Sequence, residues 1–199
     1  MSTENSTDKT PANSSAGAKD HGDEYRRLIE LGIALSAELD HNKLMENILL
    51  TAKEFCNADA GTLYLMAEKN ELCFQIIRND SLEIALGGTT GKSIDFPAVQ
   101  IFDEKGEPNL NNVSAAAAVT GQTINIRDAY ASNRYDFSGT KKFDESTGYH
   151  SQSFLTVPLK NHEGDVIGVL QLLNAQDRET GEVRDFSEDI EPLIEALAS

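Results

Sequence analysis

A glycine-rich run, Gly87–Ser93, is the stretch of this sequence that looks most like a site for nucleotide chemistry. Its last three residues match the end of the phosphate-binding pattern GxxxxGKS, in which backbone amides cradle phosphates. That pattern requires a glycine at position 86, where the chain has Leu86. The run also lacks the preceding strand and following helix that the mechanism needs. The sequence therefore does not predict a P-loop here.

Thiol and imidazole side chains are few and scattered. Cys56 and Cys73 lie in apolar stretches and form no CxxC pair. The four histidines are separated along the chain and flanked by polar residues, at His21, His41, His150 and His162. We expect buried, reduced thiols and no metal cluster. The sequence also shows no nucleophile motif and no paired catalytic carboxylates.

Composition limits the partners that this chain could have. Its 199 residues are 39% hydrophobic and 25% charged, which is typical of one globular domain with tails. The formal net charge of -16 would repel nucleic-acid phosphates and anionic lipids, so neither partner is expected. No apolar run approaches the roughly 20 residues that cross a bilayer, and the N-terminus lacks the apolar core of a secretory signal. We therefore expect a cytoplasmic protein.

The first 57 residues of the chain divide into a tail and two helices. Residues 1–21 have too few apolar side chains to offset the entropy of ordering, so they are predicted to be disordered, with a folded domain over 22–199. Apolar residues at three- and four-residue steps predict a helix over 25–39. A second helix is expected between Asp40, a good N-cap, and Asn57.

A β-rich segment follows these helices. Two β-favouring runs, 62–66 and 72–77, are joined by a short polar connection and predict an antiparallel hairpin. Residues 79–112 contain several Gly and Pro residues and are predicted to form a long loop. The Ala-rich segment 113–120 predicts a short helix, and 123–126 a brief strand.

The C-terminal third is predicted to contain a loop, a hairpin and a helix, in that order. A polar loop is expected over 128–151, followed by the clearest hairpin of the chain, with strands at 154–159 and 166–173. Pro158 should lie near an edge or a bulge, because proline cannot donate a backbone hydrogen bond. An apolar stripe predicts a last helix with Asp189 as its N-cap.

This order of elements predicts an α+β sandwich, and four motifs narrow it further. The motifs occur in sequence at Asn125–Tyr130, Phe143–Tyr149, Val157–Asn161 and Val166–Asn174. In these motifs the chain resembles GAF domains, both the tandem ones of cyclic-nucleotide phosphodiesterases and the bacterial ones attached to adenylate cyclases or HD-type phosphohydrolases. The resemblance covers about residues 28–198. It implies a GAF-like (PAS-like) central antiparallel sheet of five or six strands, with helices on one face and loops plus a short helix over the other.

The resemblance also implies a cavity for a small molecule, with cyclic AMP or cyclic GMP as the candidate ligand and no other cofactor. The positions that match the family's ligand contacts are Thr62, Ile77, Arg78, Val113, Ser114, Asp144, Thr147, Ser151 and Gln171. The helix amides at Val113 and Ser114 would face the phosphate, while Asp144 and Thr147 would contact the base or ribose. The segment Thr147–Tyr149 combines a hydroxyl, a flexible glycine and an amphipathic ring, so it could close a loop over the cavity.

Three positions depart from the family pattern. Arg78 stands where the family has an acidic residue that reads the base, which should weaken guanine recognition, and Gln171 replaces another acidic position. The family's Asn-Lys motif survives only as Asn174, because Ala175 follows it. The ion pair that the lysine would make with an aspartate therefore cannot form.

Three functions remain open on the sequence alone. The first is a sensor module that binds a small ligand and passes the signal, through the helices of a homodimer, to an attached output domain. The second is a scaffold that dimerises without a ligand. The third, more remote, is an enzyme that reduces free methionine sulfoxide, which would need a thiol in the loop before the last hairpin, and residues 128–152 contain none. We therefore expect a regulatory domain and not an enzyme.

Overall fold

The computed structural model describes residues 40–68 and 70–199. The predicted tail over 1–21 and the predicted helix over 25–39 lie outside the described residues. Within the described part of the chain, no helix is both long and apolar enough to cross a membrane.

The helix α2 spans His41–Cys56 and begins and ends where its capping residues predict. The side chain of Asp40 accepts hydrogen bonds from the backbone amides of Asn42 at 3.0 Å and Lys43 at 3.3 Å. Asn57 closes the helix in the left-handed conformation, with φ of 48°, which asparagine tolerates better than most residues. The prediction of this helix is confirmed.

A single antiparallel sheet forms the centre of the fold. Six strands follow one another across it in the order β3-β2-β1-β7-β6-β5, while β4 pairs with β2 and β8 with β7. The strands span Ala58–Ala67 (β1), Glu71–Asn79 (β2), Ile84–Gly87 (β3), Val99–Gln100 (β4), Ile124–Ile126 (β5), Phe154–Lys160 (β6), Val166–Gln176 (β7) and Val183–Arg184 (β8). Both predicted hairpins are confirmed, as β1–β2 and β6–β7.

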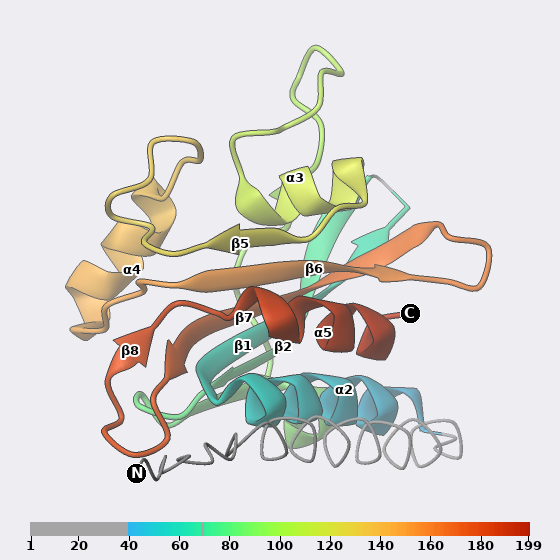
Figure 1. Ribbon diagram of the computed structural model, residues 1–199. Helices are drawn as coiled ribbons and strands as arrows, with labels where there is room; N and C mark the ends of the chain where they lie inside the picture. The colour runs from blue at the N-terminus through green and yellow to red at the C-terminus, as the bar shows by residue number, and fades with distance from the viewer. Residues whose placement is uncertain (1–39, 69) are drawn as a thin grey trace, which may run out of the picture. The chain divides into compact units, whose positions relative to one another are not determined.

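Helices cover both faces of the sheet. Figure 1 shows α3 on one side, and α2 with α5 (Glu191–Leu197) on the other. On the α2 side, a Cβ at Gly61 would lie 2.7 Å from Leu49 Cδ1, so the glycine allows α2 to pack closely against β1. On the opposite side, α3 (Val113–Thr120) buries Ala115 and Ala117 against Tyr64 and other core residues. Small alanine side chains let this helix lie close to the sheet.

Two predicted loops contain regular structure. The stretch 79–112 holds β3, a 3-10 turn at Gly88–Thr90 (η1) and β4, in addition to irregular chain. The stretch 128–151 holds the helix α4, Ser138–Thr147. The reason that α4 was missed is its composition: Ser, Thr, Gly and Lys dominate, and Phe143 is its one large apolar residue. Such a segment carries no helical stripe to detect, and only its packing in the fold makes it helical.

The hairpin β6–β7 has the predicted irregularity near Pro158. β5 pairs with β6 only as far as Thr156, so Pro158 lies on an unpaired stretch of that edge. A register shift follows between Leu159 and Lys160. A Cβ at Gly168 would lie 2.3 Å from the carbonyl oxygen of Tyr64, so the close approach of β7 to β1 requires glycine at this position.

The C-terminal helix begins differently from the prediction, which gave Asp189 as the N-cap. The Ser187 hydroxyl instead accepts a hydrogen bond from the Asp189 amide at 3.4 Å and caps a 3-10 turn at Glu188–Ile190 (η2). The helix α5 continues from that turn, with Pro192 in its first turn, where a missing amide hydrogen costs nothing. The observed cap, Ser187, therefore lies two residues before the predicted one, because a 3-10 turn precedes the helix.

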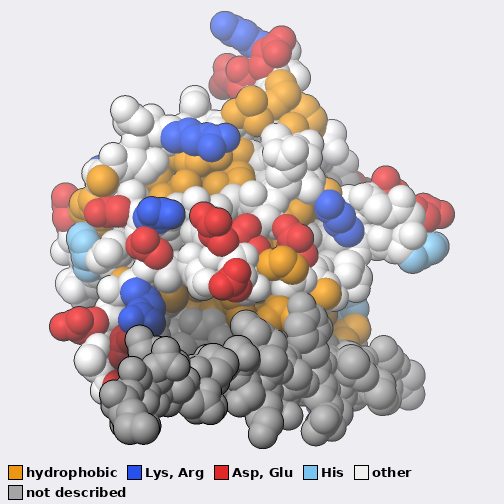
Figure 2. Space-filling model, viewed as in Figure 1, with side chains coloured by type: hydrophobic (Ala, Val, Ile, Leu, Met, Phe, Trp, Pro, Cys, Tyr) orange, Lys and Arg blue, Asp and Glu red, His pale blue; other side chains and the backbone are white. Residues whose placement is uncertain are grey.

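The loop between β4 and α3 stands away from the sheet (Figure 1). Its tip carries exposed acidic and basic side chains, and Figure 2 shows apolar side chains gathered below them. Phe102 and Leu110, in this loop, are 36% and 50% exposed. Apolar side chains are therefore accessible to solvent on this part of the surface.

Candidate functional site

A cavity of about 250 Å³ lies on the α3 side of the sheet, at the end where α4 covers it. It is lined from β1, β2, β3, α4, β6, β7 and two connecting segments. The lining residues are Ala60, Thr62, Phe74, Ile77, Arg78, Asn79, Ile84, Leu86, Phe96, Thr140, Phe143, Tyr149, Ser151, Phe154, Gln171 and Leu173. Segments that are far apart in the sequence therefore converge on one cavity.

Strand register explains why three predicted site residues meet in this cavity. Thr62 is the cross-strand partner of Ile77 on one side and of Gln171 on the other. Paired residues share a face of the sheet, so these three side chains form a row across β2, β1 and β7. Ser151, another predicted site residue, lines the cavity from the segment before β6.

Arg78, another predicted site residue, also belongs to the lining, but its guanidinium is directed to the opposite face of the sheet. It pairs with Gly61, which faces α2, so the alternation of the strand turns the guanidinium away from the row of Thr62. Its Nη2 donates to Glu46, and its Nη1 donates to the carbonyls of Ile77 at 2.8 Å and Leu86 at 2.7 Å. Burial would raise the pKa of Glu46, but hydrogen bonds from Thr89 and Arg78 outweigh it and hold that pKa below 4.5.

Gln171 is held by a buried hydrogen-bond network. Its Nε2 donates to the hydroxyls of Ser114 and Thr156, both at 3.1 Å, and its Oε1 accepts from the Tyr64 hydroxyl at 3.4 Å. Burial raises the pKa of Tyr64 to about 12, so the phenol stays protonated and remains a donor at neutral pH. The network fixes the orientation of the glutamine and joins the cavity floor to α3.

The start of α3 does not line the cavity. Val113 and Ser114 are buried, with 5% and 4% of their surface exposed, and the side chain of Asn112 accepts a hydrogen bond from Ala115 N at 3.0 Å. Ser114 reaches the cavity only through Gln171. The expected contact between a phosphate and these two amides therefore does not follow from the geometry.

Asp144 is buried beside the cavity, and both of its carboxylate oxygens accept hydrogen bonds from other residues of the chain. Its Oδ2 accepts hydrogen bonds from the Tyr130 hydroxyl and the Ser151 amide, and its Oδ1 from the Ser151 hydroxyl, all at 2.8 Å. Thr147 is exposed, and its hydroxyl donates to the carbonyl of Phe143 at 2.8 Å. Neither residue is among those that line the cavity. Asp144 holds Ser151, which does line it.

Two residues that are not among the predicted ligand contacts organise this end of the cavity. The Tyr149 hydroxyl donates to Asp59 Oδ2 at 2.6 Å, and burial together with this carboxylate raises the tyrosine pKa. Asn174 accepts from Gln152 N at 2.8 Å and donates to the carbonyl of His150 at 2.8 Å. The sequence held signals for both, in the Thr147–Tyr149 segment and in the surviving asparagine of the family motif.

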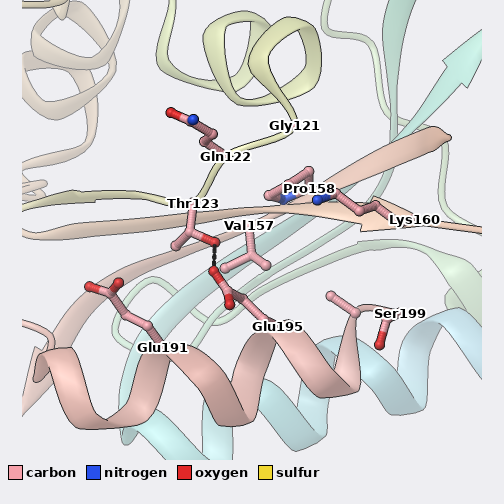
Figure 3. A pocket seen from close by; sticks show the side chains of 10 residues that line it. Gly121, Gln122, Thr123, Val157, Pro158, Lys160, Glu191, Glu195 and Ser199 are labelled. Atoms are coloured by element: carbon pink, nitrogen blue, oxygen red, sulfur yellow. Dashed lines mark hydrogen bonds between the residues drawn. The ribbon is translucent and has the colours of Figure 1, made fainter. Parts of the chain in front are cut away.

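A second, larger groove of about 530 Å³ lies between α5 and the edge of β6. Figure 3 shows Thr123 and Glu195 facing each other across it, and the threonine hydroxyl donates to the glutamate. One helical turn earlier, Glu191 accepts a hydrogen bond from Asn125 Nδ2 at 2.7 Å. These contacts attach α5 to Asn125 in β5 and to Thr123, the residue before that strand.

The two thiols do not contribute to the cavity. Both cysteines are free and partly buried, and neither belongs to its lining. Burial raises the pKa of Cys56 to about 12, so this thiol is protonated at neutral pH and is a weak nucleophile.

Comparison with known proteins agrees with this architecture. The solved GAF domain of a phosphoenolpyruvate-protein phosphotransferase from Coxiella burnetii is 15% identical, with a TM-score of 0.61 and 87% of each chain covered. A free methionine-R-sulfoxide reductase from Neisseria meningitidis is 17% identical, with a TM-score of 0.57, 86% of this chain covered and 81% of that one. At such identities these likenesses show a common fold.

Similar sequences occur in cyclic-nucleotide phosphodiesterases. The chain is 29% identical over 177 residues to a dual 3',5'-cyclic-AMP and -GMP phosphodiesterase 11A from Takifugu rubripes, covering 89% of this chain and 18% of that protein. It is 30% identical over 158 residues to a cGMP-specific 3',5'-cyclic phosphodiesterase from Drosophila ananassae, covering 76% and 12%. The chain thus spans less than a fifth of these relatives. The GAF domain family model matches residues 40–199, and the chain belongs to the GAF domain family.

Proposed function

We propose that this chain is a sensor domain that binds a small molecule in the cavity between the sheet and α4 and regulates an attached output domain. The single observation that carries the proposal is the row of Thr62, Ile77 and Gln171 at the floor of a mainly apolar cavity. Few polar groups in an apolar cleft are typical of small-molecule sites. The chain itself has a regulatory and not a catalytic role in this proposal.

The relatives make cyclic AMP and cyclic GMP the first ligands to test. In this proposal Thr62, Ile77, Ser151 and Gln171 contact the ligand, and Asp144 acts by holding Ser151. Arg78 belongs to the lining, while its guanidinium binds Glu46. Thr147 supports the end of α4, and Val113 and Ser114 support Gln171 from behind.

Signal transmission in the proposal runs through the helices. The chain dimerises through the helix expected over 25–39 together with α5, and the output domain belongs to the longer protein. The attachment of Glu191 and Glu195 to the β5 region supports this role for α5, because it connects the helix to the sheet that forms the cavity floor. Light scattering at tens of micromolar protein should detect the dimer.

Calorimetric titration of the 199-residue chain with cyclic AMP and cyclic GMP tests the proposal. At least one should bind with a Kd below about 1 mM. Ile77→Trp should abolish binding by filling the cavity, whereas Ile167→Trp, at a site 45% exposed and outside the lining, should bind normally. Loss of binding in both variants, or in neither, would contradict the assigned site.

A second candidate is a scaffold that acts without a ligand, favoured by the exposed Phe102 and Leu110. Exposed apolar side chains of this kind mark protein contact sites. If neither nucleotide binds and Phe102→Ser weakens self-association in light scattering, the scaffold explains the data better than the sensor does.

A further inference from the structure

We infer that this cavity recognises an uncharged, flat aromatic ring and that it does not hold an anionic group such as a phosphate. The inference rests on the proposed function, because it takes the same cavity as the ligand site. It adds the chemical class of the part of the ligand that lies inside.

The walls are suited to the faces of a ring. Four phenylalanines line the cavity from β2, the segment after η1, α4 and β6, namely Phe74, Phe96, Phe143 and Phe154. Phe74 and Phe96 already contact each other, with ring centroids 5.5 Å apart and planes tilted by 48°. Aromatic rings prefer tilted or offset contacts of this kind, and a flat ligand ring can extend the cluster in the same way.

Among the described residues that line the cavity, no cation is available to an anion. Arg78 is the single charged residue among the lining residues, and its guanidinium is bound to Glu46 and to two backbone carbonyls on the α2 side. The side chains of this ion pair are 8% and 12% exposed. An anion entering the cavity would lose its hydration without gaining a counter-charge, which opposes binding.

Two buried carboxylates stand behind the cavity wall. Asp59 accepts from the Tyr149 hydroxyl at 2.6 Å, and Asp144 accepts from the Ser151 hydroxyl at 2.8 Å. Their relative exposures are 5% and 4%, so solvent screens them poorly. Because Tyr149 and Ser151 both line the cavity, the negative potential of these carboxylates reaches it and repels an anion.

Helix amides do not replace the missing cation. The residues that begin α3, Val113 and Ser114, are buried and are not part of the lining. The side chain of Asn112 already caps this end of the helix. The positive end of the α3 dipole is thus directed at the protein and not at the cavity.

Size and polarity fit one ring system. The volume of about 250 Å³ lies below the roughly 300 to 1,000 Å³ of sites for drug-sized ligands. The hydroxyls of Thr62 and Thr140, from opposite walls, are suited to hydrogen bonds with the edge of a ring that carries ring nitrogens or carbonyl groups.

Matched pairs of ligands test the inference on the 199-residue chain. Adenosine is titrated against cyclic AMP, and guanosine against cyclic GMP, so that each pair differs in the phosphate. We expect at least one nucleoside to bind within about threefold of its cyclic nucleotide or more tightly. Thr140→Phe should block that binding by filling the cavity from α4, whereas Lys142→Phe, exposed on the same helix and outside the lining, should not.

The other outcomes separate this inference from the proposed function. A cyclic nucleotide that binds at least about tenfold more tightly than its nucleoside, and is blocked by Thr140→Phe, would overturn the inference while supporting the sensor function. Absence of binding by all four compounds would overturn the inference and remove the support for the proposed ligand. Nucleoside binding that Thr140→Phe leaves unchanged would place the ring elsewhere and also overturn it.

Discussion

Glu46 on α2 and Arg78 on β2 form a buried ion pair that joins the helix layer to the sheet. Arg78 also donates to the carbonyl of Leu86 at 2.7 Å, and Glu46 accepts from the amide of Thr89 at 2.8 Å. One carboxylate and one guanidinium therefore connect α2, β2, β3 and η1. The strand edge that forms one wall of the cavity depends on this connection.

Removal of one partner should be costly. Arg78→Ala leaves the partly buried Glu46 carboxylate with the Thr89 amide as a donor but without its counter-charge, so we expect the free energy of unfolding to fall by about 3 kcal/mol in urea denaturation. Arg184→Ala breaks an exposed pair with Asp177, in which the arginine is 61% exposed, and should cost less than about 1 kcal/mol. The double variant Glu46→Leu/Arg78→Met should recover much of the loss. If Arg78→Ala and Arg184→Ala lowered the free energy of unfolding equally, the Glu46–Arg78 pair would not behave as a buried one.

The same pair predicts an acid-dependent loss of stability. The pKa of Glu46 is lowered below 4.5 in the folded protein, so the folded state favours the ionised carboxylate. Its contribution is fully present above the unfolded pKa and is lost as the pH falls through the folded pKa. The difference in unfolding free energy between the natural chain and Glu46→Gln should therefore shrink on acidification below pH 4.5. A difference that stays constant would exclude Glu46 as the titrating group.

Asp144 should control both a loop and the ionisation of Tyr130. Hydrogen bonding to Asp144 raises the pKa of Tyr130 to about 12. Asp144→Asn removes the charge, so ultraviolet titration should show this tyrosine ionising at lower pH. Asp144→Ala leaves Ser151 without both of its hydrogen bonds to the carboxylate and should cost about 2–3 kcal/mol of unfolding free energy. An unchanged tyrosine titration in Asp144→Asn would disprove the coupling.

Two glycines should respond to alanine in opposite directions. Gly168→Ala places a Cβ 2.3 Å from the carbonyl oxygen of Tyr64 and should cost at least about 1–3 kcal/mol, because backbone must move. Gly139, in the first turn of α4, has open space around its Cβ position and no positive φ. Gly139→Ala should therefore stabilise the protein by about 0.5 kcal/mol. Thermal unfolding measures the change in stability of each variant. A Gly168→Ala variant as stable as the natural chain would contradict the close packing of β7 on β1.

Local signals account for the elements that the sequence predicted well. The capping residues Asp40 and Asn57 delimit α2, the alanine run ending at Gly121 delimits α3, and β-favouring runs define both hairpins. Each of these signals acts within a few residues. The helix α4 gives no such signal, since it has little apolar surface and its one buried residue is Asp144.

Side-chain direction in the site could be predicted only where strand register was already known. Thr62 and Gln171 share a face because they are cross-strand partners, and Arg78 leaves that face because it pairs with Gly61. The resemblance to the family implies that Arg78 and Asp144 are ligand contacts, but it does not say that each side chain is bound by the protein. That information depends on Glu46, which lies outside the motifs and 32 residues from Arg78, and on Tyr130, which ends a different motif from the one that holds Asp144.

The contact of Tyr149 with Asp59 should hold the segment before β6 over the cavity. Asp59 is 5% exposed and accepts the tyrosine hydroxyl at 2.6 Å and the Ser81 hydroxyl at 2.7 Å. Tyr149→Phe leaves the ring in the cavity wall but deprives the carboxylate of one donor, at a cost of about 1.5–3 kcal/mol. Ser146→Ala, which removes an exposed hydroxyl bonded to its own helix, should change stability by less than about 0.5 kcal/mol.

A double-mutant cycle separates this hydrogen bond from general effects of each change. Asp59→Asn removes the charge that, after burial, contributes to the raised pKa of Tyr149, so the tyrosine should then ionise at lower pH. The unfolding free energies of Tyr149→Phe, Asp59→Asn and the double variant should give an interaction energy of about 0.5–3 kcal/mol. Strictly additive losses would mean that the two side chains act independently. In that case the segment before β6 would depend on Asn174, which binds it at Gln152 N and His150 O.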